Sequence, residues 1–206
     1  MREQGARRVV LGVVLAATWL GAVALPSFAG APTDAMKSTI DEVLRIIREK
    51  DLQHPSKAEE RRTQLEQVVG ARFDYKEMSR RALGRPWRTL SNEQKEEFVD
   101  LFRTLLTNSY ADKIETYSGE GVQYLNERTE QEYAEVRTKV LSAKTEIPLD
   151  YRLINRGEDW RVYDVVVDGV SLVNNYRGQF RKILSASSYS DLVDQLREKS
   201  DKLKAP

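Results

Sequence analysis

The spacing of apolar residues changes near Gly121, and this change limits the folds that the chain can adopt. Before Gly121, apolar residues recur at steps of three and four, as in Met36, Ile40 and Leu44, which places them on one face of a helix. After it, apolar and polar residues alternate through residues 134–140, as in a half-buried strand. The order predicts an α+β fold, with helices packed on one face of an antiparallel sheet.

The starts of the predicted helices carry capping residues. Ser91 and Gln94 have the capping-box spacing, in which each side chain can bond the other's free backbone N–H group, and Ser56 has the same spacing to Glu59. Asp74 can cap another helix. The sequence therefore predicts four helices before the sheet, over about residues 34–50, 56–70, 74–84 and 91–117.

The strands that follow are joined by short turns, which favours a meander. A turn at residues 155–159 connects the third strand to the fourth, and two further helices end the chain. We expect a curved four-stranded antiparallel sheet with a hydrophobic cavity between it and the helices. The predicted strands cover residues 122–125, 134–140, 147–153 and 160–167, and the terminal helices cover about residues 174–184 and 188–202.

The first 29 residues have the three parts of a secretory signal peptide. A basic start with three arginines precedes the uncharged run 9–25, and the small residues Ser27 and Ala29 stand where a signal peptidase cleaves. A membrane anchor is the alternative, but the run is at the short limit for crossing a bilayer. We expect residues 1–29 to be removed, and residues 30–206 to form one exported domain in the bacterial periplasm. Its helical front covers about residues 34–119, its sheet about 121–168, and its terminal helices about 174–203.

Composition excludes several kinds of function. Cysteine is absent, which excludes disulfides, thiol nucleophiles and cysteine-ligated metals. The 33 basic and 32 acidic residues nearly balance, so a nucleic-acid surface is not expected. The single histidine, His54, lies in a polar connector. It can be a base or a lone ligand, or an ordinary exposed loop residue. We predict no catalytic residue, metal or cofactor.

Asp164 is the one polar residue inside an otherwise apolar strand segment. In a hydrophobic pocket its pKa would rise and it could remove a proton from a substrate. On the other face of the sheet it would pair with a cross-strand arginine such as Arg152. Strand alternation predicts that the neighbouring Tyr163 faces away from it, which counts against a catalytic pair.

Apolar residues of the helices and the sheet can together enclose a ligand. A sheet closed by helices can leave a cleft between the two layers, and such clefts commonly bind ligands. Glycine would let the chain bend at the Gly169–Val170 turn, which we place near the mouth. The predicted lining residues are Met78, Phe98, Leu101, Phe102, Leu105, Tyr110, Val136, Val140, Leu149, Tyr151, Val170, Leu172, Tyr176 and Phe180.

Two blocks of sequence after the predicted signal peptide carry further short motifs. The first block reads RFDYKEM at 72–78, ALGRPWRTLSNEQ at 82–94 and FVDLF at 98–102. The second reads WRVYDV at 160–165, DGVSLV at 168–173 and NYR at 175–177, followed by Phe180. Together the blocks resemble the MlaC family, also called toluene-tolerance auxiliary proteins. The resemblance extends over nearly the whole chain after the signal peptide, in the right order and spacing.

The resemblance implies a periplasmic phospholipid carrier without catalytic activity. Such a carrier would shuttle lipid between an outer-membrane lipoprotein complex and an inner-membrane ABC transporter complex, and so maintain outer-membrane lipid asymmetry. We expect it to be a monomer. Three alternatives remain: a carrier for another lipid such as a hopanoid, a small α+β cone enzyme using Asp164 as a base, and a structural adaptor with a filled core.

Overall fold

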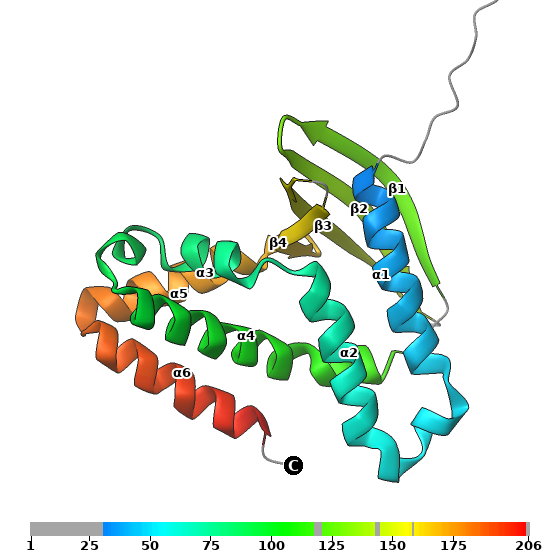
Figure 1. Cartoon of the computed structure of the whole chain (residues 1–206), viewed down its shortest axis with the longest axis horizontal. Helices are drawn as coiled ribbons and strands as arrows, with labels where there is room; N and C mark the ends of the chain where they lie inside the picture. The colour runs from blue at the N-terminus through cyan, green and yellow to red at the C-terminus, as the bar shows by residue number, and fades with distance from the viewer. Residues whose placement is uncertain (1–30, 118–120, 143–144, 158, 205–206) are drawn as a thin grey trace, which may run out of the picture.

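The structure, a computed structural model, describes residues 31–117, 121–142, 145–157 and 159–204. The predicted signal peptide lies outside the described residues. Within them, six α-helices and five strands follow one another in the order helices, sheet, helices (Figure 1). The helices are α1 (Ala31–Arg48), α2 (Ala58–Arg72), α3 (Tyr75–Leu83), α4 (Asn92–Glu115), α5 (Leu172–Ala186) and α6 (Tyr189–Lys204). The strands are β1 (Gly121–Glu130), β2 (Tyr133–Leu141), β3 (Glu146–Arg156), β4 (Asp159–Val167) and β5 (Val170–Ser171).

Two of the three predicted helix starts are confirmed. The Asp74 carboxylate accepts a hydrogen bond of 2.9 Å from the Glu77 backbone N–H. The Ser91–Gln94 capping box forms reciprocally, with hydrogen bonds of 2.9 and 3.2 Å. Each bond satisfies a backbone donor that the first turn of a helix would otherwise leave unpaired.

The predicted Ser56–Glu59 box is wrong. Residues Pro55–Lys57 form a 3-10 turn, and α2 begins only at Ala58. Nδ1 of the exposed His54 accepts a 3.2 Å bond from the Ser56 N–H, and the Ser56 hydroxyl lies 2.7 Å from the same nitrogen. Because His54 already binds this hydroxyl, Ser56 does not cap α2. His54 is thus an exposed loop residue with a local capping role.

The strands form one antiparallel sheet in the order β1-β2-β3-β4-β5. The prediction of four strands was one short. Asp168 (φ 49°) and Gly169 (φ 79°) both have left-handed backbone, so the chain reverses sharply after β4. Val170 then pairs with Val167, and Ser171 pairs with Val166. This two-residue strand is too short to give a periodic signal in the sequence.

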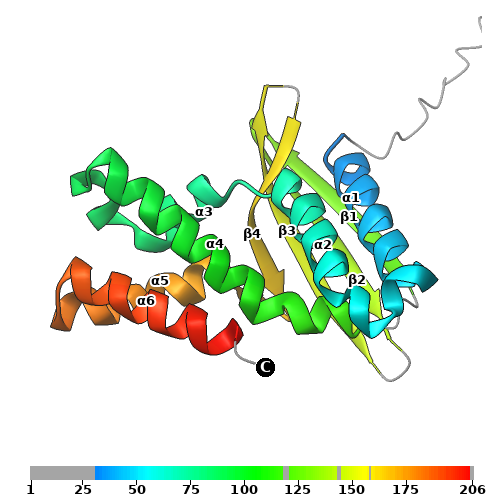
Figure 2. The same ribbon diagram turned by 60° about the horizontal axis from the view of Figure 1, so that its bottom comes forward.

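The described helices contribute to three apolar clusters, of which the smallest, Ile46, Ile47, Leu52 and Leu65, joins the end of α1 to α2. Helix α1 packs on one face of the sheet, and its Met36, Ile40 and Leu44 contact the buried side chains of β2, β3 and β4 (Figure 1). We call this the sheet cluster. Helices α3, α4, α5 and α6 pack chiefly on one another, beside the sheet (Figure 2), around Phe98, Phe102 and other aromatic rings. We call this the helical cluster. None of the described helices is long and apolar enough to span a membrane.

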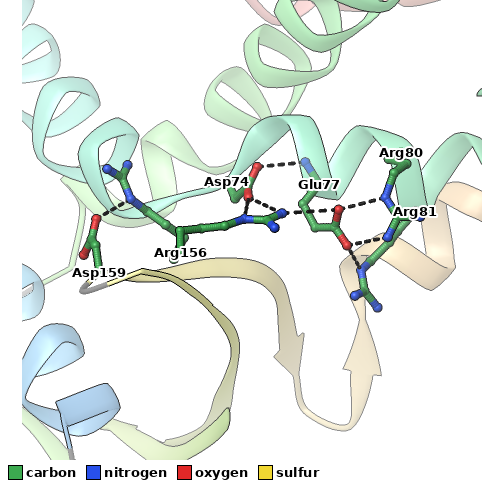
Figure 3. A network of polar contacts seen from close by, with 7 residues as sticks. Asp74, Glu77, Arg80, Arg81, Arg156 and Asp159 are labelled. Carbon is green, nitrogen blue, oxygen red and sulfur yellow. Dashed lines mark hydrogen bonds and ion pairs between the residues drawn. The ribbon is translucent and has the colours of Figure 1, made fainter. Parts of the chain in front are cut away.

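A network of charged side chains joins the start of α3 to the sheet (Figure 3). Arg156 of β3 binds the carboxylates of Asp74 and Glu77, at 2.9 and 3.5 Å. Glu77, which is buried, also binds Arg80 and Arg81 at 2.6 and 2.7 Å. The two arginines hold the pKa of Glu77 down at about 2, against an ordinary value of 4.5. The network therefore fixes the helical cluster to the sheet by charge as well as by packing.

Candidate functional site

An uninterrupted row of apolar side chains crosses all five strands at one end of the sheet. Val122 of β1 pairs with Val140 of β2, which pairs with Ile147 of β3. Two residues further on, Leu149 pairs with Val167 of β4, which pairs with Val170 of β5. Paired residues in an antiparallel sheet point to the same face, as do residues two apart in a strand. We call the row the open apolar band: Val122, Val140, Ile147, Leu149, Val167 and Val170.

The band lies on the face that α1 covers, but beyond the part that α1 buries. Further along the same strands, Val136, Tyr151 and Leu153 are buried against α1. In the band Val122, Val140, Leu149 and Val167 are half-buried, while Ile147 is 40% exposed and Val170 57%. A contiguous exposed apolar surface on a folded chain usually marks a binding site.

The opposite face of the sheet is polar and gives Asp164 its partners. Asp164, only 3% exposed, accepts hydrogen bonds from Arg152 (3.1 Å), the Ser171 hydroxyl (2.6 Å) and the Val173 N–H (3.0 Å). The predicted cross-strand pair with Arg152 is therefore confirmed. Because Val173 lies in the first turn of α5, Asp164 also holds that helix end against the sheet.

The prediction that Tyr163 faces away from Asp164 is wrong. Arg152 pairs with Asp164 and the next residue, Leu153, pairs with Val162, so a β-bulge leaves Tyr163 without a partner. The Tyr163 ring packs edge-on against Tyr133, which shares the polar face. The bulge breaks the alternation on which the prediction relied.

Removal of the Asp164 carboxylate should destabilise the fold. Asp164→Ala is expected to lower the free energy of unfolding by about 2 kcal/mol, since it leaves a buried N–H group and a hydroxyl without their acceptor. Denaturant unfolding measures this. Asp150→Ala is the control: Asp150 is half-buried on the same face but accepts no hydrogen bond within the described residues. Equal stability of the two variants would contradict the structural role of Asp164.

The helical cluster is closely packed, with one groove at its surface. Phe102 contacts the rings of Tyr176 and Phe180, with centroids 5.2 and 5.5 Å apart. A groove of about 290 Å³ runs between α5 and α6 above this cluster. Leu105, Tyr176 and Phe180 lie in its floor, and the glutamine and lysine side chains of the two helices form its rim.

A second hollow, of about 730 Å³, lies at the C-terminal end of α1. Its lining is charged apart from Leu44. Such a surface does not suit an apolar ligand, because buried charges without partners are costly.

The fourteen predicted lining residues fall into three groups. None of the described pockets brings them all together, and their role in one cavity stays a prediction. Eight belong to the helical cluster or pack against it: Met78, Phe98, Leu101, Phe102, Leu105, Tyr110, Tyr176 and Phe180. Four belong to the sheet cluster or pack against it, namely Val136, Leu149, Tyr151 and Leu172, while Val140 and Val170 lie in the more exposed part of the open apolar band.

The sequence prediction omitted three residues of the band, Val122, Ile147 and Val167. All three belong to strands that the sequence predicts, although β1 extends to Glu130, beyond the predicted end at residue 125. Only the register between strands brings them into one row, and the register depends on turns and bulges that a single strand's pattern does not reveal.

Fold and site together define a class: a small α+β protein with an antiparallel sheet that α1 covers incompletely, leaving an apolar surface suited to an apolar ligand. The chain belongs to the MlaC family, whose model, described as MlaC protein, matches residues 37–198.

Similar proteins include two curated relatives. The intermembrane phospholipid transport system binding protein MlaC of Haemophilus influenzae is 25% identical over 124 residues, which cover 57% of this chain and 58% of that relative. The match thus spans less than two thirds of the Haemophilus protein. The toluene tolerance protein ttg2D of Pseudomonas putida is 26% identical over 155 residues, or 74% of this chain and 72% of ttg2D.

A solved structure has the same fold. It is the phospholipid-binding protein from Ralstonia solanacearum, determined in complex with a phospholipid. The two chains share 26% sequence identity with a TM-score of 0.78, and the match covers 85% of this chain and all of the Ralstonia chain.

Proposed function

We propose that this protein binds a phospholipid and carries it through the periplasm. The observation that carries the proposal is the match, over 85% of this chain, to the fold of a protein solved with a phospholipid bound. The open apolar band supplies a surface on which acyl chains can leave water.

The energetics of acyl chains explain the need for such a surface. Burial of each CH₂ group contributes about 0.8 kcal/mol, so one chain of ~16 carbons gains over 10 kcal/mol by leaving water. Without a carrier, a lipid molecule therefore rarely leaves a membrane for water. A carrier has to offer apolar burial that roughly matches the membrane, since much tighter binding would prevent release.

Loading requires the apolar clusters to open. The groove of about 290 Å³ is at the lower limit for ligand pockets, which span roughly 300–1,000 Å³. Acyl chains must therefore displace side chains of the protein. We infer that they enter at the open apolar band, because Val140, Ile147 and Val170 are already only partly covered. From there they would reach the fourteen lining residues named above.

We further propose the wider transport role that membership of the family suggests. It comprises export behind the signal peptide 1–29, a single lipid-binding domain at 30–206, and exchange of lipid with an outer-membrane lipoprotein complex and an inner-membrane ABC transporter complex. We propose a monomeric carrier that binds lipid without transforming it. Asp164, the candidate base of the enzyme alternative, has its acceptors engaged by three donors of the fold.

Native mass spectrometry of protein purified from bacteria without added lipid tests the proposal. A mass increment equal to a phospholipid supports it. An increment equal to the mass of a hopanoid would show that the cargo is a hopanoid and not a phospholipid. A bare polypeptide mass under gentle ionisation would contradict the carrier function and favour a filled core.

A charge at the tip of the band should weaken lipid retention. Val170→Glu is expected to lower the fraction of lipid-bound protein severalfold, because the carboxylate must lose its water when acyl chains cover the band. Leu125→Glu is the control, since Leu125 is similarly exposed (48%) but lies at a bulge of β1 outside the band. Equal retention in both variants would place the entrance elsewhere.

A further inference from the structure

Four arginines differ from all other arginines in the described part of the chain. Arg85, Arg88, Arg177 and Arg181 make no hydrogen bond, ion pair or ring contact there, whereas every other described arginine makes at least one. All four side chains are exposed. We call this set the arginine surface.

The four residues are neighbours in space. A Cβ atom on Gly84 would lie 3.4 Å from two nitrogens of the Arg177 guanidinium, so Arg177 of α5 rests on the end of α3. Arg85 follows Gly84 directly, and Arg88 lies three residues further in a 3-10 turn, where such residues share a face. Arg181 is one helical turn beyond Arg177. Helices α3 and α5 lie side by side (Figure 1).

No acidic residue neutralises this surface from its own segments. Residues 78–92 and 169–190 contain no Asp or Glu, although the chain as a whole has 32 of them against 33 basic residues. Lys182, next to Arg181, adds another exposed cation. These two segments thus carry basic residues without acidic ones in an almost neutral molecule, which creates a local field that attracts anions.

We propose that the arginine surface docks this protein on an anionic phospholipid bilayer. The planar guanidinium group forms paired hydrogen bonds with phosphate oxygens, which makes arginine well suited to a surface of lipid phosphates. Helix α5 also begins two residues after Val170, the most exposed residue of the open apolar band. Docking through α5 therefore brings the band within roughly 15 Å of the contact.

The composition of the surface favours a bilayer over an acidic protein. Protein interfaces usually have an apolar centre within a polar rim. The large apolar residues that are exposed among the described ones are Leu125, Ile147 and Val170, and none of them belongs to the arginine surface. A surface of guanidinium groups without an apolar centre matches headgroups better than a protein partner.

Co-sedimentation with lipid vesicles tests the proposal. The wild-type protein should bind vesicles of phosphatidylglycerol at low salt, release them at high salt, and not bind vesicles of phosphatidylcholine. Arg85→Gln, Arg88→Gln and Arg181→Gln together should weaken binding by about a hundredfold, since each basic residue contributes roughly a fivefold factor. Arg177 is left unchanged because it packs on Gly84.

The matched control removes three exposed lysines elsewhere, by Lys37→Gln, Lys50→Gln and Lys113→Gln. Net charge changes equally, but binding should fall much less. Equal loss of vesicle binding in both triple variants would overturn the proposal, because binding would then depend on net charge and not on these arginines. Failure of the wild-type protein to bind either vesicle would also overturn it and point to an acidic protein surface. Docking through the arginine surface does not require bound lipid, so the triple arginine variant should still co-purify with lipid. If the wild-type protein co-purified without lipid, that result would contradict the carrier function but not the docking proposal.

Discussion

Replacement of Glu77 by glutamine is expected to lower the free energy of unfolding by about 3 kcal/mol. The carboxylate is buried, and Arg80 Nε and Nη2 and Arg81 Nε donate to it at 2.6–2.8 Å. Glutamine cannot form these ion pairs, and the lowering of the Glu77 pKa from 4.5 to about 2 corresponds to about 3 kcal/mol of favourable interaction in the folded state. Arg156 would also lose one of its two carboxylate partners, so the join between α3 and the sheet should loosen (Figure 3).

The pH dependence of this effect has a definite sign. The pKa of Glu77 is lowered to about 2 in the folded protein, chiefly by the hydrogen bond with Arg80 and also by Arg81. A lowered pKa means that the carboxylate stabilises the fold fully above about pH 4.5 and loses this contribution as the pH falls towards 2. Denaturant unfolding at a series of pH values should therefore show wild type and Glu77→Gln converging in acid.

Glu42→Gln is the matched control for Glu77. Arg45 Nε and Nη2 donate to Glu42 at 2.9 and 2.7 Å, the same pattern that Arg80 makes with Glu77, but both side chains are exposed. Exposed pairs of this kind contribute little, so no measurable loss of stability is expected. If both variants were equally stable, burial would not be the source of the Glu77 effect.

Local signals in the sequence predict most of the elements correctly. Capping by Asp74 and the Ser91–Gln94 box each depend on a few adjacent residues, and both occur. The Ser56–Glu59 box failed because a histidine two residues earlier offers a competing acceptor. Strand β5 was missed because two residues cannot show a period.

Arrangement in space was harder to predict than the elements. The sequence predicts one lining that includes both Phe98 and Val136. In the structure Phe98 packs among the helices and Val136 under α1, and their shared role in lipid binding stays a prediction. Apolar periodicity says that a residue is buried, not which element buries it. The open apolar band depends on register across five strands, and the arginine surface depends on the contact of α5 with α3. Both depend on contacts between residues far apart in the sequence, which the local pattern of residue types does not reveal.

Val140 offers the sharpest test of the open apolar band. It is half-buried in the middle of the row, between Val122 and Ile147, yet it does not belong to the packed sheet cluster. Val140→Glu should therefore fold normally and retain phospholipid at least tenfold less than wild type, because acyl chains on the band would bury an unpaired carboxylate. Native mass spectrometry of the purified variant measures the lipid-bound fraction, and denaturant unfolding checks its stability.

The adjacent residue supplies the control, because successive residues of a strand point to opposite faces. Lys139→Glu introduces the same side chain one position away, on the polar face, where Lys139 now pairs with Glu146 at 2.9 Å. That exposed pair is weak, so stability should change little. Retention should be lost in Val140→Glu and preserved in Lys139→Glu if lipid occupies the face that α1 covers. Loss in Lys139→Glu alone would place the lipid on the opposite face, and would then make the contacts of Asp164 and Arg152 part of the binding surface.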